Sequence, residues 1–329
     1  MGDGMSDAET AAPAIAMNAV SRRFARIDAF YRNITRLSAL AVFGVLAGII
    51  LSLYLGAFLS INKFGLAFVW TNAWSPVKEN FGGLAQIYGT LVSSAIAMLL
   101  AVPVGIGIAI FLTELSHPYI KRPVGIAIEL LAGIPSIIYG MWGLFIFAPF
   151  LQIHVQPALI DFFAGVPILE DLFAGPPFGI GLLTGGIVLA IMILPFIASI
   201  TRDVFDGVPP VLKEAAYGLG STRWEVLWNV VLPYSRTGVT GAVMLALGRA
   251  LGETMAITFI VGNAHRISPS LFAPGTTISA TIANEFAEAT TDIHVSALIE
   301  LGLILFAMTF AVLLAARYML YRAQQRAGR

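Results

Sequence analysis

Four charged side chains interrupt the apolar runs of this sequence and are its first candidates for chemistry. Arg249 and Glu253 stand four residues apart in LGRALGETMA, and Glu129 and Glu300 lie in two other apolar runs. A charged side chain inside a lipid bilayer is costly and usually serves a function. The planar fork of arginine matches the oxygens of phosphate or carboxylate. We therefore predict that Arg249 and Glu253 line a transport pathway for an anion, with Glu253 holding the arginine in place.

An alternative interpretation of the same two residues is purely structural. Side chains four apart on one helix share a face and can pair, and a buried ion pair can order a helix bundle without touching a substrate. Glu300 lies near the outer end of its apolar run, where a hydrated, snorkelling carboxylate is the simpler explanation. Glu129 faces either the interior or another subunit, and we assign it no role.

The composition argues against catalysis by this chain alone. The sequence has no cysteine, its four histidines are scattered without the spacing of metal ligands, and no phosphate-binding loop pattern occurs. The net charge of zero gives no sign of a nucleic-acid partner. We expect a transport subunit that is not an enzyme, with no catalytic residue and with no metal or cofactor bound by this chain.

Lipid is the solvent that the composition indicates, because 58% of the 329 residues are hydrophobic and only 12% are charged. A spanning helix needs about 20 mostly apolar residues. Six segments qualify and predict an all-α membrane protein with six transmembrane helices: Leu37–Phe58, Tyr88–Leu112, Pro123–Phe150, Pro177–Ile200, Thr237–Val261 and Val295–Ala316.

The basic residues predict how the chain crosses the membrane. Of the 19 lysines and arginines, fifteen lie on one side of these segments, Arg249 lies within one, and Lys63, Lys78 and Arg266 lie on the other side. Because lysine and arginine accumulate in cytoplasmic loops, both termini are expected in the cytoplasm. The outer loops are then residues 59–87, 151–176 and 262–294.

Two tails flank the spans in the expected domain organisation. Residues 1–17 are polar and rich in alanine, which favours disorder. Apolar residues then recur at three- and four-residue steps from Val20 to Ile34, which predicts an amphipathic helix in the cytoplasmic interface; a positive anchor for the first span is the open alternative. The expected domains are a cytoplasmic N-terminal tail with this interfacial helix (1–36), a six-span domain (37–320) with a cytoplasmic segment at 209–233, and a cytoplasmic C-terminal tail (321–329).

The cytoplasmic segment contains KEAAYGLGSTRWEVLWNVVLP, from Lys213 to Pro233, which is half polar and half apolar. Pro209 and Pro210 can open a helix, since its first turn needs no amide donors. Gly218 and Gly220 interrupt the pattern, and a second apolar set follows. We predict two short helices joined at a glycine bend. A loop that only floats at the interface is the alternative, and too few basic residues are present for a helix-turn-helix DNA reader.

The spacing in this stretch resembles the EAA loop of ABC-importer permeases. Their pattern is E-A-A, three residues, G, nine residues, I, one residue, L-P, and Val230 in place of isoleucine is the only departure. In that family the loop forms the coupling helix, which docks in a cleft of a separate ATPase subunit. The resemblance implies ATPase coupling for Glu214, Ala215, Ala216, Gly220, Leu232 and Pro233.

Four further segments resemble the PstC family, the permeases of phosphate importers. They are ELLAGIPSIIYGMWG (129–143), MILPFIASITRDVFDGVP (192–209), GRALGETMAITFIVGN (248–263) and ANEFAEA (283–289). The resemblance implies the type I ABC importer permease fold, phosphate as substrate and the bacterial cytoplasmic (inner) membrane as location. In that family the arginine and glutamate of G-R-A-x-G-E-T matter for transport, which corresponds to Arg249 and Glu253.

The resemblance also implies partners. They are a PstA-like permease that completes a heterodimer, two PstB-like ATPase subunits and a PstS-like phosphate-binding protein. ATP and magnesium would belong to the partner ATPase, which would drive alternating access through the coupling helix. Another oxyanion such as molybdate, or the PstA position in the same complex, stays open. Two other classes are a membrane sensor or scaffold, which needs no intramembrane Arg–Glu pair, and a membrane enzyme, which needs clustered His, Asp or Glu.

Overall fold

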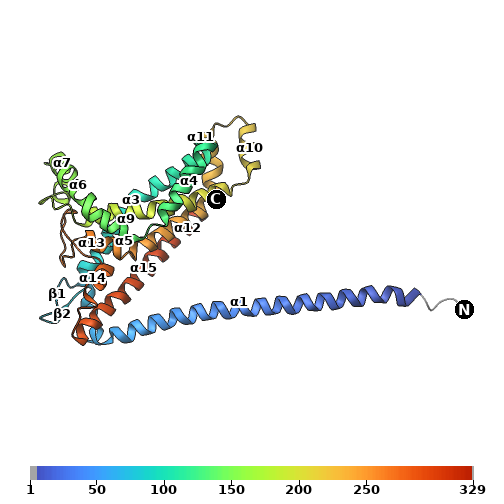
Figure 1. Cartoon of the computed structure of the whole chain (residues 1–329), viewed down its shortest axis with the longest axis horizontal. Coiled ribbons are helices and arrows are strands. Elements are labelled where there is room, and N and C mark those ends of the chain that lie inside the picture. The colour runs from blue at the N-terminus through green and yellow to red at the C-terminus, as the bar shows by residue number, and fades with distance from the viewer. Residues whose placement is uncertain (1–5, 328–329) are drawn as a thin grey trace. The chain divides into compact units, whose positions relative to one another are not determined.

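The computed structural model describes residues 6–327, and helices dominate this part of the chain (Figure 1). Contacts divide the chain into a unit that ends at Leu55 and a larger unit from Gly56 to Arg329. The first unit is part of one helix, α1 (Ser6–Phe64).

The N-terminal helix differs from the expected tail. Residues 1–5 lie outside the described part of the chain, but the chain is already helical at Ser6, where we expected disorder up to residue 17. Alanine is the best helix former, and no glycine or proline occurs between residues 14 and 43, so nothing ends the helix before the first span. The side chains of residues 6–27 are not described, and the interfacial position of residues 20–36 stays a prediction.

The larger unit begins with the end of α1 and a short antiparallel hairpin that pairs Trp74 with Phe81 and Ser75 with Asn80. Its first half contains α2 (Ala67–Trp70), β1 (Trp74–Ser75), β2 (Asn80–Phe81), α3 (Leu84–Ile110), η1 (Phe111–Leu115), α4 (Pro118–Ala132), α5 (Ser136–Trp142), η2 (Gly143–Phe147), α6 (Ala148–Phe150), η3 (Leu151–Val155), α7 (Gln156–Phe163) and α8 (Leu169–Leu172). Its second half contains α9 (Leu182–Asp206), α10 (Pro210–Gly218), α11 (Arg223–Val226), η4 (Leu227–Val231), α12 (Leu232–Leu251), α13 (Met255–Ile260), α14 (Ile278–Glu285) and α15 (Asp292–Ala327).

Six helices in the described residues are long and apolar enough to cross a membrane, which confirms the predicted number. They are Asp28–Phe64, Leu84–Leu115, Ser136–Phe163, Leu182–Asp206, Arg223–Leu251 and Asp292–Tyr318.

Two predicted spans have the wrong limits. The predicted third span, Pro123–Phe150, runs across a break between α4 and α5, and the observed helix begins only at Ser136. Pro135 explains the break, since proline lacks an amide hydrogen and disfavours helical backbone in the residue before it. The predicted fifth span, Thr237–Val261, crosses a second break at residues 252–254, and the observed helix begins much earlier, at Arg223.

Prolines also explain the local widening of the helices. Within residues 6–327 the chain forms four π-helical turns, of which η2, η3 and η4 each end two residues before a proline (Pro149, Pro157 and Pro233). A proline cannot donate to the carbonyl four residues earlier, and a wider turn accommodates the missing bond without breaking the helix.

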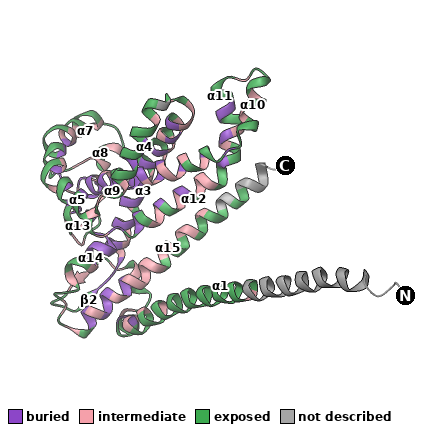
Figure 2. Cartoon of the chain, turned by 45° about the vertical axis from the view of Figure 1, so that its right-hand side comes forward, coloured by how far each residue is buried: buried purple, intermediate pink, exposed green. Residues whose placement is uncertain are grey.

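The core of the larger unit lies where α3 packs on α9. Glycines allow this approach: a Cβ atom at Gly105 would lie 2.9 Å from the side chain of Ile197, and one at Gly186 would lie 2.6 Å from that of Ile96. Small residues are the usual means of close helix packing in membranes. Buried side chains follow α3, α9 and the first turns of α15, whereas α10 is exposed (Figure 2).

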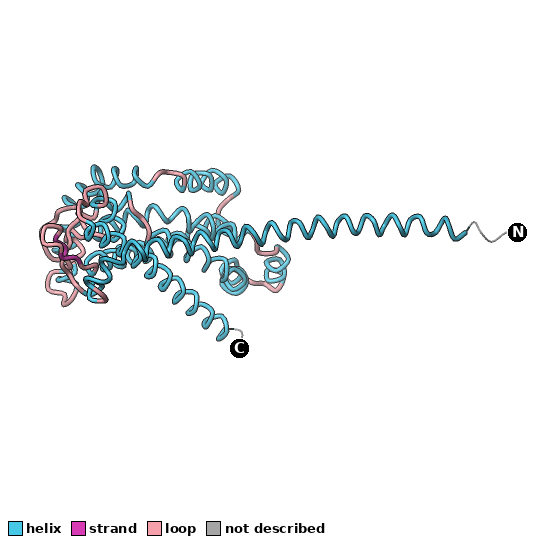
Figure 3. The backbone as a smooth tube through the Cα atoms, turned by 90° about the horizontal axis from the view of Figure 1, so that it is seen from below, coloured by secondary structure: helices cyan, strands magenta, loops and turns pink. Residues whose placement is uncertain are grey.

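The larger unit has two ends that differ in character (Figure 1). One end, called here the α10 end, carries α10, α11 and the last turns of α15. The other, called the hairpin end, carries β1, β2, α13, α14 and the loops around them (Figure 3). The predicted cytoplasmic segment 209–233 therefore lies at the α10 end, and the predicted outer loops 59–87 and 262–294 lie at the hairpin end.

Candidate functional site

The coupling segment forms two helices with a glycine bend, as predicted, but the second helix is not short. The first helix, α10, ends at Gly218, and Gly220 has a φ of 88°, a left-handed conformation that favours glycine. Thr222 then caps the next helix together with Glu225, in a reciprocal capping box. From Arg223 the helix continues through η4 and α12 to Leu251, so the second half of the segment is the start of a span.

The α10 helix has one face toward its own chain and one face away from it. Ala216 packs against a cluster that includes Phe205 and Val226. Glu214 and Ala215 are exposed, and no side chain of α10, all of which is described, is buried. The residues implied for ATPase coupling are therefore not equivalent, since Ala216 faces inward while Glu214 and Ala215 face outward.

Leu232 and Pro233 do not lie on the exposed face of α10. Leu232 belongs to the continuous helix and packs against the same cluster as Ala216. Pro233 follows the π-helical turn Leu227–Val231. Both residues shape the junction between the coupling segment and the fifth span, whereas Glu214, Ala215 and Gly220 present a surface.

An ion pair ties α10 to the end of the second span. Lys213 Nζ lies 2.6 Å from Glu114 Oε1, and the side chains are 20% and 9% exposed. Glu114 belongs to η1, which continues α3, the helix at the centre of the core. Glu114 could not be recognised from the sequence, because a single acid at the end of an apolar run has no local pattern that reveals its partner.

We predicted that Arg249 and Glu253 share one helix, but the structure places them on either side of a helix end. The α12 helix ends at Leu251, and Glu253 is buried in the break before α13. Its Oε1 accepts a hydrogen bond from Ala256 N at 3.2 Å, and its backbone oxygen accepts one from Ser279 Oγ at 2.6 Å. The carboxylate thus caps the first turn of α13.

Arg249 is exposed and forms no ion pair with Glu253 or with any other described residue. The carbon at the centre of its guanidinium lies 6.0 Å from the centre of the Phe196 ring, on α9. This distance is at the outer limit of a cation–π contact. Glu253 therefore does not hold Arg249 in place; it holds the broken helix, and the hydrogen-bonding groups of the guanidinium stay available.

Glu129 and Glu300, the other two charged residues of the apolar runs, lie in environments that the sequence did not predict. Glu129 Oε1 on α4 lies 2.7 Å from Arg202 Nη2 on α9, so it pairs within this chain. Gly125 makes room, because a Cβ atom there would lie 2.5 Å from Arg202 Nη1. Glu300 is only 5% exposed, and its Oε2 has no hydrogen-bond partner among the described residues. The expectation of a hydrated, snorkelling carboxylate is therefore wrong.

The hairpin end holds a polar network that sequence analysis missed. Glu285 accepts hydrogen bonds from Trp74 Nε1 at 3.0 and 2.8 Å and lies 2.9 Å from His265 Nε2 and 3.0 Å from His294 Nε2. Burial alone would raise the pKa of Glu285, but the hydrogen bonds from His265, Trp74 and His294 bring it below its ordinary value.

Two of the four scattered histidines thus meet at one carboxylate. Glu285 lies in ANEFAEA, a segment recognised in the sequence without a role for its acids. The network joins the hairpin, α14 and α15 by hydrogen bonds. No group of described residues has the arrangement of a metal site. The pairing of His265 with Trp74, across 191 residues, has no signal in the local sequence.

These features define a class of protein: a chain with six helices long and apolar enough to span a membrane, and with an exposed helix and a glycine bend between the fourth and fifth of them. Residues 101–327 match the family profile described as "Binding-protein-dependent transport system inner membrane component". The chain belongs to this family and is a multi-pass inner-membrane transport permease subunit, not an enzyme.

Individual proteins provide a more specific comparison than the family profile does. The chain is 61% identical to the phosphate transport system permease protein PstC of Mesorhizobium japonicum over 98% of its own length and 100% of that protein. It is 56% identical to PstC of Pasteurella multocida, with 92% and 94% covered. A permease chain of a bacterial alginate ABC transporter has a similar fold, with a TM-score of 0.58 at 16% identity, 89% of this chain and 97% of that chain being covered. This likeness confirms the predicted type I ABC importer permease fold.

Proposed function

We propose that this chain is a permease subunit of an ATP-driven, binding-protein-dependent importer of inorganic phosphate. The observation that carries the proposal is the extent of the likeness to the phosphate permeases, which covers nearly the whole chain and not the coupling segment alone. In this function the chain forms the translocation pathway with a second, PstA-like permease. A PstS-like binding protein delivers phosphate, and two PstB-like ATPase subunits bind the ATP and magnesium.

The α10 end faces the cytoplasm in this proposal. Support comes from the basic residues, because Lys121, Arg202 and Lys213 lie at the α10 end in ion pairs with acids of neighbouring helices. Lys63, Lys78 and Arg266 lie at the hairpin end. Cytoplasmic segments carry the excess of lysine and arginine, so the hairpin end faces outward and receives the binding protein.

The α10 helix then couples the ATPase to the spans. Its outward residues Glu214 and Ala215 enter the cleft of the ATPase, where the small alanine side chain lets the helix approach closely. Its inward residues, Lys213 and Ala216, attach it to Glu114 and to the cluster around Phe205. A displacement of α10 would therefore be transmitted to η1 and α9, because these contacts are mostly buried and closely packed, so that one element cannot shift without moving the other.

Arg249 contributes the charge that an anion needs in the pathway. Its guanidinium is exposed and has no carboxylate partner among the described residues. An arginine in this state can form two parallel hydrogen bonds to phosphate oxygens. Glu253 acts indirectly. It caps α13 and so stabilises the break between α12 and α13, next to Arg249. Broken helices are a frequent way to place polar backbone and charge at a transport site.

Reconstitution of the complete transporter tests the function. The four-component complex in proteoliposomes, with ATP inside and phosphate-loaded binding protein outside, should accumulate radioactive phosphate. Uptake should stop without ATP or without the binding protein, and molybdate or sulfate in excess should not compete. Accumulation of molybdate in preference to phosphate would assign the chain to another oxyanion importer.

A further inference from the structure

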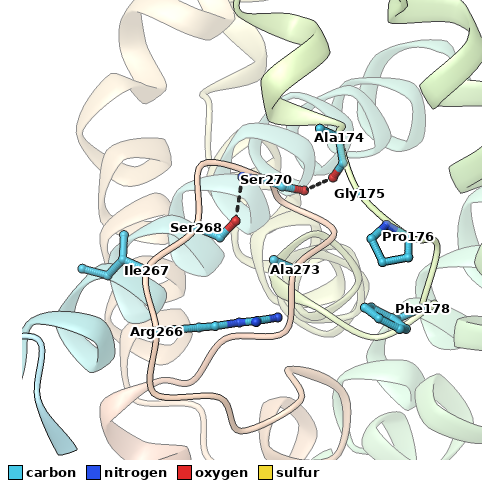
Figure 4. Close-up of a pocket in the computed structure, with 9 residues that line it drawn as sticks. All are labelled: Ala174, Gly175, Pro176, Phe178, Arg266, Ile267, Ser268, Ser270 and Ala273. Atoms are coloured by element: carbon cyan, nitrogen blue, oxygen red, sulfur yellow. Dashed lines mark hydrogen bonds between the residues drawn. The ribbon is translucent and has the colours of Figure 1, made fainter.

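A pocket of about 450 Å³ opens at the hairpin end (Figure 4), and neither Arg249 nor Glu253 is among the residues that line it. One wall is the segment 174–178 between α8 and α9, and the other is the loop between α13 and α14, from Arg266 to Ala273. The side chain of Arg266 extends across the pocket toward Phe178. Among the nine described residues that line it, Arg266 is the only charged one.

Arg266 has hydrogen-bonding capacity that no residue in the described part of the chain uses. Its side chain is exposed and forms no ion pair or hydrogen bond with any described residue. Ser268 Oγ accepts a hydrogen bond from Ser270 N at 3.2 Å, and its own hydroxyl hydrogen has no acceptor among the described residues. Both donors belong to the same pocket, and no carboxylate competes for them there.

The loop that carries Arg266 is held on both sides of it. The His265 ring is bound to Glu285 and lies parallel to the Trp74 ring. The backbone oxygen of Ser268 accepts a hydrogen bond from Tyr88 at 3.1 Å. Further along, Ser270 Oγ donates to Ala174 O at 2.5 Å, which joins the two walls of the pocket. The donors are therefore preorganised, which lowers the entropic cost of binding a ligand.

The pocket is connected to the pathway residues by one short helix. Glu253 caps the start of α13, and the loop with Arg266 follows the end of this helix directly. Six helical residues span about 9 Å, and Arg266 follows the last of them by six residues, so the pocket and the Glu253 cap belong to neighbouring parts of the chain.

We propose that this pocket is a receiving site for a small oxyanion, occupied by phosphate between its release from the binding protein and its arrival at Arg249. The assignment rests on the proposed function for the identity of the anion. A tetrahedral oxyanion suits the donors, because the arginine fork binds two oxygens and the Ser268 hydroxyl a third. A volume of 450 Å³ leaves room for hydrating water, which keeps binding weak enough for the anion to leave.

Thiol labelling tests the site independently of transport. The sequence has no cysteine, so an Ile267→Cys variant of the assembled complex carries one thiol in this chain, on the pocket rim. We expect this thiol to react about tenfold faster with an anionic methanethiosulfonate reagent than with a cationic one, and millimolar phosphate to slow the anionic reagent. Adding Arg266→Gln should remove both effects, and adding Lys78→Gln, at another exposed base of the hairpin end, should remove neither. Equal reaction rates with and without Arg266, or no protection by phosphate, would overturn the proposal.

Transport kinetics test whether the site serves phosphate or the binding protein. In proteoliposomes, Arg266→Gln should lower the maximal phosphate uptake by about tenfold, the effect of losing one charged hydrogen-bonding partner. The binding-protein concentration for half-maximal uptake should not change, and Arg266→Lys should retain part of the rate. An unchanged maximal rate with a higher half-saturating concentration would assign Arg266 to binding-protein docking and refute the receiving site. Should the unmodified complex not transport phosphate at all, the proposed function fails, while the labelling result still decides whether the pocket binds anions.

Discussion

Lys213 on the coupling helix and Glu114 at the end of the second span form an ion pair of 2.6 Å across 99 residues of sequence. The pair is the most buried Lys–carboxylate contact among the described residues, and together with Ala216 it joins the largely exposed α10 helix to the rest of the larger unit. A firm joint of this kind is needed wherever a displacement outside the membrane must move helices within it.

Removing Lys213 should uncouple transport from ATP hydrolysis. Lys213→Met leaves Glu114 largely buried and unpaired, which costs about 3 kcal/mol, and so loosens α10 from η1. The phosphate transported per ATP hydrolysed in proteoliposomes should fall by about tenfold, within the range of couplings between sites. Lys121→Met is the matched control, because its pair with Asp206 is 38% and 45% exposed and such pairs contribute about 0–1 kcal/mol. An unchanged ratio in the Lys213 variant would mean that the pair carries no coupling.

Reversing the charge of Glu214 should weaken the contact with the ATPase. The side chain is exposed on α10 and has no ion-pair partner among the described residues, so its replacement changes the surface and not the fold. Glu214→Lys should reduce the amount of ATPase that co-purifies with the permease or should uncouple hydrolysis from uptake. Asp161→Lys serves as the charge-reversal control, because Asp161 is an exposed acid on α7, within the expected outer loop 151–176. Normal co-purification together with normal coupling would exclude Glu214 from docking.

The structure separates the roles of Arg249 and Glu253, and conservative variants can verify this. Arg249→Gln should abolish phosphate uptake while the complex still assembles, because the charge itself meets the anion. Glu253→Gln should retain much of the uptake, since its amide oxygen can still accept the hydrogen bond from Ala256 N. Glu253→Ala removes the cap and should lower thermal stability by about 1 kcal/mol. Equal loss of uptake in Glu253→Gln and Glu253→Ala would instead favour a charge role for Glu253.

The network at Glu285 predicts how stability depends on pH. The pKa of this carboxyl lies below its ordinary value of 4.5 in the folded chain, so its contribution to stability is complete above 4.5 and is lost as the pH falls through the lower, folded-state pKa. Thermal melting followed by tryptophan fluorescence should show a drop in midpoint below pH 4.5. In Glu285→Gln this drop should be smaller. A variant with the same acid dependence as the parent would assign that dependence to other carboxyls.

Much of the architecture and of the coupling surface could be predicted from the amino-acid sequence. Hydropathy is a sum over neighbouring residues, so six apolar runs sufficed to predict six spans. The two apolar sets on either side of Gly218 and Gly220 sufficed to predict two helices joined at a glycine bend. The same local character explains the errors: a hydropathy window continues through Pro135 and Gly252, because the chain stays apolar where these helices end.

Tertiary structure alone decided which side chains meet. Glu114 and Lys213, Glu129 and Arg202, and Glu285 with its two histidines are contacts between segments remote in the sequence, and no pattern of spacing encodes them. The pair Arg249 and Glu253 illustrates the difference most clearly. Their types and spacing predicted a charged pair within the membrane, but the end of α12 between them decided that Glu253 caps a helix and that Arg249 is left available to an anion. Sequence determines which groups are present; the packing of distant helices determines their partners, because each contact depends on where both backbones lie.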